Sequence, residues 1–233
     1  MTPALPDVPD WPEAERLARE KEALGFFISG HPLDRHRDVV RAFERTNTRN
    51  LAEHAGKKIE LACVVTGVAR QVSRRDGTEW GKLTVEDFHG TATVLAFREA
   101  WQANKERLRQ DAAVLLRGAV SNRERDEEDP PIFLDEVLPL SDLAGSGALA
   151  VRIELESASA VPGDAFTKAR TLIASRPGSA PLELVLGPGN GGSTPCFRSR
   201  TLRLDPDEAT LAELQKLFGK GHVRLVRREA EAG

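Results

Sequence analysis

Residues that could bind a nucleic acid cluster between positions 70 and 82. Five side chains supply this chemistry: Arg70, Arg74, Arg75, Trp80 and Lys82. Guanidinium groups stay charged and pair bidentately with phosphate, and a base that stacks on an aromatic ring gains about 1–3 kcal/mol. Positions 80 and 82 of a strand share a face, which would place the indole beside a cation. The pattern predicts a surface for single-stranded nucleic acid, and a solvated loop next to a core tryptophan is the alternative that these residues leave open.

Basic side chains recur at two other places in the chain. The stretch after residue 120 offers Arg123 and Arg125, but four acidic residues follow at 126–129. These would repel phosphate, which favours a solvated loop. Near the C-terminus six arginines lie on or directly beside segments predicted to be strands: Arg198, Arg200, Arg203, Arg224, Arg227 and Arg228. A second DNA contact, the rim of a protein-docking surface and solvated strand faces are all compatible with them.

No set of residues has the spacing of a catalytic or metal centre. His31 and His36 lack cysteine or carboxylate neighbours at ligand spacing, which favours a structural turn histidine. Asp87 has no partner carboxylate and is predicted to cap the turn at 89–90. The glycine-rich stretch 187–192 precedes no Lys-Ser/Thr pair, so it is not a phosphate loop. We predict no catalytic residue, no metal and no cofactor, and the missing paired carboxylates disfavour a nuclease.

The composition is that of a globular protein with nearly balanced charge. Among 233 residues, 33 basic and 36 acidic side chains give a formal charge of -3, so binding to a polyanion requires a local basic patch. Cys63 lies in an apolar strand pattern and Cys196 in a Gly/Pro-rich loop, so no disulfide is expected. No apolar stretch approaches the ~20 residues that cross a bilayer, and residues 1–10 lack the pattern of a secretory signal. We therefore expect a cytoplasmic protein.

The nucleic-acid candidates fall on a predicted small barrel. Apolar residues alternate from Ile59 to Val65, and Gly67 is expected to bend this strand sharply. A polar loop over 70–78 follows it. The other predicted elements are helices at 13–27, 33–44 and 98–108 and strands at 80–87, 91–97, 112–120 and 132–140. This order is that of a five-stranded OB-fold, in which the loop after the first strand and the face of strands two and three contact oligonucleotides. Periodicity alone leaves another small barrel open as the alternative.

A second unit follows a small-residue linker at 141–147. Its predicted strands lie at 149–155, 181–186, 197–204 and 223–226, and its helices at 163–175 and 207–218. This is a βαββαβ order, like that of ferredoxin-like domains. The fold class is thus a β-barrel plus an α+β domain, divided into a helical lead-in over 1–55, an OB-fold over 56–143 and an α+β domain over 148–228.

Two segments resemble a known family. Residues 20–33, EKEALGFFISGHPL, closely resemble the EKEALGFYLSGHPL segment of the bacterial DNA polymerase III alpha-subunit family, with Phe27 where the family usually has tyrosine. Residues 81–97, GKLTVEDFHGTATVLAF, resemble that family's OB-domain pattern. The resemblance covers most of the chain and weakens after about Leu143.

The resemblance implies a non-catalytic role for this part of such a subunit. The family's catalytic aspartates lie in a palm domain far upstream, and its clamp-binding peptide normally precedes the EKEALGF segment. What remains resembles the end of the clamp-binding region, the OB domain, and a C-terminal domain that docks the clamp-loader tau subunit in several relatives. We expect a single-stranded-DNA-binding and replisome-assembly region, in a fragment or split chain that works with the rest of the polymerase. A protein-interaction adaptor whose barrel binds a protein instead of DNA is the alternative.

Overall fold

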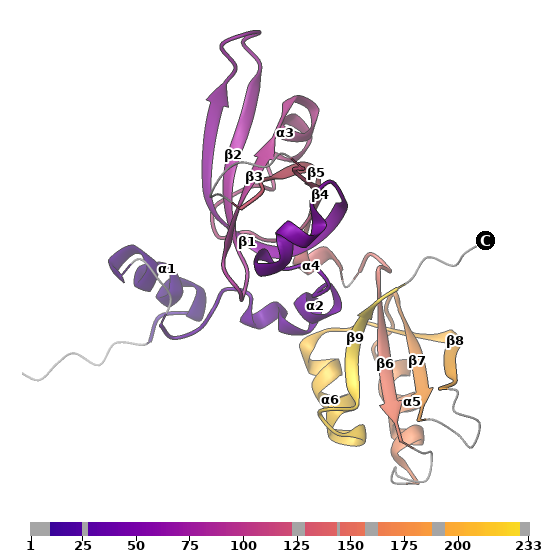
Figure 1. Cartoon of the computed structure of the whole chain (residues 1–233). Coiled ribbons are helices and arrows are strands. Elements are labelled where there is room, and N and C mark those ends of the chain that lie inside the picture. The colour runs from indigo at the N-terminus through magenta and orange to yellow at the C-terminus, as the bar shows by residue number, and fades with distance from the viewer. Residues whose placement is uncertain are drawn as a thin grey trace, which may run out of the picture.

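The computed structural model describes residues 10–24, 28–122, 129–143, 145–156, 163–187 and 194–228. Figure 1 shows an N-terminal helical segment, a barrel and a second sheet in that order along the chain. The N-terminal segment contains helices α1 (Glu13–Leu24) and α2 (Arg37–Ala42) and the short 3-10 turns η1 (Asp34–His36) and η2 (Thr48–His54). The single helix predicted over 33–44 is therefore divided between η1 and α2. Part of the predicted helix 13–27 lies outside the described residues, as do the arginines at 123 and 125 and most of the glycine-rich stretch 187–192.

Five strands close into a barrel in the order β1-β2-β3-β5-β4. They are β1 (Lys58–Val72), β2 (Glu79–Glu86), β3 (Thr91–Ala96), β4 (Ala113–Val120) and β5 (Ile132–Pro139), with helix α3 (Arg98–Asn104) between β3 and β4. This strand order confirms the OB-fold prediction. Alternate residues of each strand fill the interior, among them Leu61, Cys63, Leu83 and Val94.

A β-bulge in the first strand confirms the bend predicted at Gly67. The register between β1 and β2 shifts between Val65 and Gly67. Before the bulge the odd-numbered residues of β1 point into the barrel, and after it the even-numbered residue Val68 lies opposite the interior residue Leu83. The strand then continues to Val72, so the loop predicted over 70–78 is too long by three residues.

The α3 helix packs its tryptophan against β2. Trp101 is buried at 5% exposure, and a Cβ atom added at Gly81 would lie only 2.4 Å from two of its ring carbons. The indole therefore requires a glycine directly beneath it. Because Gly81 projects inward, its neighbours Trp80 and Lys82 project to the outer surface of the barrel.

The second sheet has the order β8-β7-β6-β9. Its elements are β6 (Leu149–Leu155), α5 (Ala165–Ser175), β7 (Ala180–Leu186), β8 (Cys196–Leu204), α6 (Glu208–Phe218) and β9 (Val223–Arg227). The predicted βαββαβ order is confirmed, but the comparison with ferredoxin-like domains is wrong. A split βαβ unit places another strand between its two parallel strands, whereas β6 and β7 pair directly here.

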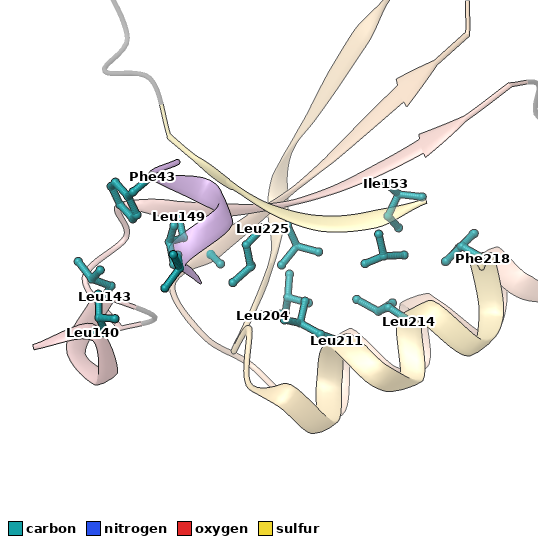
Figure 2. Close-up of a cluster of buried hydrophobic side chains, with 14 of the residues drawn as sticks. Phe43, Leu140, Leu143, Leu149, Ile153, Leu204, Leu211, Leu214, Phe218 and Leu225 are labelled. Carbon is teal, nitrogen blue, oxygen red and sulfur yellow. The ribbon is translucent and has the colours of Figure 1, made fainter. Parts of the chain in front are cut away.

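The start of the small-residue linker predicted at 141–147 is helical and contributes to the core. Residues Leu140–Leu143 form the short helix α4, and both of its leucines are at most 1% exposed. Figure 2 shows them beside Phe43, the residue that follows α2, in a cluster that continues through Leu149 into the space between the second sheet and α6. Burial of apolar surface thus joins the barrel, the N-terminal segment and the second sheet through one shared hydrophobic cluster.

Among the described residues, no helix is long and apolar enough to span a membrane.

Candidate nucleic-acid interface

The β1–β2 hairpin projects beyond the ring of the barrel (Figure 1) and carries two of the predicted arginines at its tip. Arg74 and Arg75 are exposed in the turn that joins the strands. The Ser73 amide donates to the Thr78 carbonyl at 2.9 Å, and the Gly77 amide donates to the Ser73 carbonyl at 2.9 Å. Gly77 has a φ of +66°, which glycine adopts without strain. These bonds give the tip a defined turn that holds both arginines in solvent.

Asp76 fixes this tip and connects it to α3. Its carboxylate accepts a hydrogen bond from the Thr78 hydroxyl at 2.7 Å and pairs with the Arg98 guanidinium at 3.0 Å. Hydrogen bonds from the hydroxyls of Thr78 and Ser73 hold the pKa of Asp76 well below its usual range. Asp76 therefore stays ionised at neutral pH. Its charge is paired with that of Arg98, the first residue of α3.

Trp80 and Lys82 lie on the outer face of β2, as the period of two predicts. Lys82 is exposed, and Trp80 is half-buried. The Trp80 ring centroid lies 5.4 Å from that of Phe97, and Phe97 lies 6.0 Å from Phe133. These three rings form an aromatic strip across β2, the end of β3, and β5. Phe97 is 44% exposed, so the strip offers an open π-face next to a cation.

The sequence analysis did not group Phe97 and Phe133 with Trp80. Phe97 follows β3 on its outward side, a position that strand alternation could have revealed. Phe133 joins the strip because β3 and β5 pair in parallel, with Leu95 opposite Phe133. That pairing links strands separated by a helix and a further strand, so no local pattern encodes it.

Arg70 lies on the opposite face of the ribbon from Trp80 and Lys82. Residues directly opposite each other in an antiparallel pair project to one face, and Arg70 is opposite Gly81 whereas Gln71 is opposite Trp80. The Arg70 guanidinium forms an ion pair with Glu79. The structure therefore brings Trp80 and Lys82 together, places Arg74 and Arg75 at the adjoining tip, and separates Arg70 from them.

The cations on the tip and outer face keep their charge exposed. Within the described part of the chain, Arg74, Arg75 and Lys82 have no ion-pair partner. The nearby carboxylates of Glu79 and Asp76 are engaged by Arg70 and Arg98. We use "outer-face surface" below for Trp80, Lys82, Phe97 and Phe133 together with the two tip arginines. Its aromatic rings can stack on bases while its cations meet phosphates.

Asp87 caps the turn after β2 as predicted. It is 5% exposed and accepts hydrogen bonds from the His89 amide at 2.8 Å and the Gly90 amide at 3.1 Å. Thr48 donates to the same carboxylate from its amide and its hydroxyl, each at 2.7 Å. Asp87 thus also anchors η2 to the barrel, a long-range contact that the sequence pattern does not show.

His31 has the structural geometry predicted for a turn histidine. Its Nδ1 accepts a hydrogen bond from the Leu33 amide at 3.1 Å, and its ring lies 4.9 Å from that of Phe88.

The second histidine of the predicted pair, His36, is half-buried, and this burial lowers the pKa of its imidazole. Over the described ranges, no three His, Cys, Asp or Glu residues gather into a group that could hold a metal ion.

No protein-family model matches the chain, but curated proteins do. The DNA polymerase III subunit alpha of Saccharopolyspora erythraea is 25% identical over 227 residues, which cover 93% of this chain. That of Pseudomonas fluorescens is 26% identical over 213 residues, or 91% of this chain. The chain is homologous to the DNA polymerase III alpha subunit. A 117-residue stretch is 32% identical to the Vibrio cholerae subunit and covers 49% of the chain.

The chain spans only about 18% of the length of the first two DNA polymerase III alpha relatives. Two solved structures show a partial similarity to this chain. An SSB domain from Synechococcus sp. is 17% identical with a TM-score of 0.31, and covers 34% of this chain and 91% of its own. A mitochondrial single-stranded DNA binding protein of S. cerevisiae is 14% identical with a TM-score of 0.31, and covers 36% of this chain and 95% of its own. The strand order of the barrel, rather than these scores, defines the fold.

Proposed function

We propose that this chain is a non-catalytic region of a DNA polymerase III alpha subunit that guides single-stranded DNA over its OB barrel. The observation that carries the proposal is the outer-face surface, where the aromatic strip lies beside Lys82 and below the two tip arginines. Homology to polymerase III alpha subunits supports a nucleic-acid partner.

The two kinds of side chain on this surface divide the work of binding. Bases stack on the rings of Trp80 and Phe97. This stacking does not depend on the DNA sequence, because every base has a π-face. Phosphates meet Lys82 and the tip arginines, and this contribution weakens as salt rises. A template strand of any nucleotide sequence can therefore pass over the surface, as replication requires.

Titration of a fluorescent single-stranded oligonucleotide tests the proposal. Trp80→Ala removes one stacking platform worth about 1–3 kcal/mol, so Kd should rise about 5- to 150-fold. An Arg74→Ala, Arg75→Ala double variant should lower the slope of log K against log salt by about 1.4, because each phosphate contact to a single strand contributes about 0.7.

Arg70→Ala is the matched control, since it removes an arginine from the same hairpin but from the face turned away from the aromatic strip. It should bind DNA nearly as well as the unaltered chain. Equal Kd and equal salt slope for the Trp80 variant, the tip double variant and the unaltered chain would eliminate the outer-face surface as a DNA site.

We further propose that the α+β domain over 148–228 contributes to replisome assembly by docking a clamp-loader tau-type subunit. The edge strand β8 supports this, because it exposes Phe197 at 56% and lies at the free side of the sheet. A pull-down with the purified tau-type subunit should lose signal for Phe197→Asp while DNA binding is unchanged. Retention of that subunit by a chain with no salt-sensitive DNA binding would instead favour the adaptor alternative.

A further inference from the structure

A large cleft separates the barrel from the second sheet, away from the outer-face surface. Its volume is about 1060 Å³, and its walls come from the end of α2, from β1, β4 and β5, and from the face of the second sheet opposite α5 and α6. Of the described residues that line it, nine are lysine or arginine and five are aspartate or glutamate. In a chain whose formal charge is -3, this lining is a local basic surface.

A row of charged side chains crosses the sheet wall of the cleft. Arg198 lies opposite Glu183, Glu183 opposite Arg152, and Arg152 opposite Arg224, so the row runs over all four strands. Directly paired residues project to one face of a sheet. All four residues line the cleft.

A buried carboxylate organises this row. Glu183 is 1% exposed and receives Arg152 on one oxygen, with Nε at 3.0 Å and Nη2 at 2.8 Å. Its other oxygen receives Arg198, with Nε and Nη2 each at 2.9 Å. A buried carboxylate needs such partners. Two guanidiniums exceed its single charge, so the trio presents one net positive charge in a fixed arrangement.

One ion pair joins the two sides of the cleft, since Arg227 of β9 lies 2.8 Å from Glu60 of β1. Within the barrel wall, Arg117 of β4 lies 3.0 Å from the same Glu60 carboxylate. The shared hydrophobic cluster lies behind them. The cleft is therefore preformed, and a ligand would not have to pay for bringing its walls together.

We propose that this cleft binds the phosphate backbone of a single nucleic-acid strand, as a second contact that deepens the proposed function. The cations are distributed over three walls instead of converging on one point, which suits a linear polyanion better than a single phosphate. The described lining residues include two aromatic rings, Phe43, which is 5% exposed, and the half-buried His54. Charged groups thus dominate the lining of the cleft, in contrast to the outer-face surface.

An abasic deoxyribose-phosphate oligomer keeps the phosphates and removes the bases that stack on Trp80, so its binding depends on cationic contacts alone, and the variants show which cations contribute. The test variant combines Arg41→Glu, Arg224→Glu and Arg228→Glu. Among the described residues, the first two arginines pair with the partly exposed carboxylates of Asp38 and Glu154, so the change leaves no fully buried charge without a partner. Circular dichroism shows whether the charge-reversal variant folds. If it does not, a variant with alanine at the same three positions replaces it in the test.

The matched control combines Arg109→Glu, Arg170→Glu and Lys220→Glu, which alter net charge equally at exposed positions outside the cleft. The slope of log K against log salt for the abasic oligomer should fall by about 2 in the cleft variant, because three contacts contribute about 0.7 each. The control should keep most of its slope. An unchanged slope in the cleft variant overturns the proposal.

Two further measurements separate the possible failures. If ordinary single-stranded DNA depends on Trp80 but not on the cleft arginines, this inference fails and the proposed function stands. If it depends on the cleft but not on Trp80, the outer-face surface fails and the cleft stands. If polyglutamate binds through the cleft arginines while the abasic oligomer does not, the occupant is an acidic protein segment and the nucleic-acid proposal is wrong.

Discussion

A single methyl group at Gly81 should destabilise the barrel on which the outer-face surface is built. The Cβ atom of Gly81→Ala would lie 2.4 Å from two ring carbons of Trp101, whereas carbon atoms in contact are about 3.5–4.0 Å apart. Trp101 is 5% exposed, so its ring cannot move aside without displacing other core residues. Overpacking of this kind costs about 1–3 kcal/mol.

The reduced entropy of the unfolded chain offsets about 0.4–1 kcal/mol of this cost. The net loss should be about 1–2 kcal/mol, which at a urea m value of about 2–3 kcal/mol/M lowers the unfolding midpoint by about 0.5 M. Circular dichroism during urea titration measures it. Because Gly81 lies between Trp80 and Lys82, a shift of β2 should also weaken DNA binding.

A double-mutant cycle isolates the clash. In a Trp101→Leu background the added methyl group has room, so the cost of Gly81→Ala should fall by about 1 kcal/mol. Gly77→Ala is the comparison, since no atom lies within 4 Å of its Cβ and its cost comes from a φ of +66° instead. That cost should be the same in both backgrounds. Equal costs of Gly81→Ala in the two backgrounds would refute the packing argument.

Three other outcomes follow from individual side chains. Glu183→Gln leaves two guanidiniums without their anion and should cost about 2–3 kcal/mol of stability, measured by urea unfolding, with no loss of polyanion binding. Asp207 accepts the Thr210 amide at 2.6 Å at the start of α6, so Asp207→Ala should cost about 1 kcal/mol. Hydrogen bonds from Thr210 lower the pKa of Asp207 in the folded chain. Its contribution is therefore complete above the unfolded value of about 3.9 and is lost as pH falls through the folded pKa, a loss that Asp207→Asn should remove. Burial raises the pKa of the Cys63 thiol, so iodoacetamide should label exposed Cys196 in the native chain and both cysteines only in denaturant, as mass spectrometry can resolve.

Local patterns in the sequence are enough to specify the barrel's elements and the faces of β2. A period of two places Leu83 inside and Lys82 outside, and a glycine inside a strand marks a bulge, because both effects arise from the pleat of one chain segment. The cap at Asp87 also follows from nearby residues.

The position of Arg70 required the register of the folded strands. The bulge near Gly67 inserts one residue, and one residue reverses the face of everything beyond it. Even-numbered residues of β1 lie on the outer face before the bulge and on the opposite face of the strand after it. Arg70 therefore faces away from Trp80, although both belong to the same hairpin.

What the sequence determined by itself is the order of the elements and the alternation that puts Trp80 and Lys82 on one face of their strand. Only the tertiary structure decided the aromatic strip, the shared core and the arginine cleft. Phe133 reaches Phe97 through a parallel pairing, and Arg152 meets Glu183 and Arg224 through the order of four strands. Such contacts join residues far apart in the chain, and their geometry depends on strand order and register, which no short-range spacing encodes.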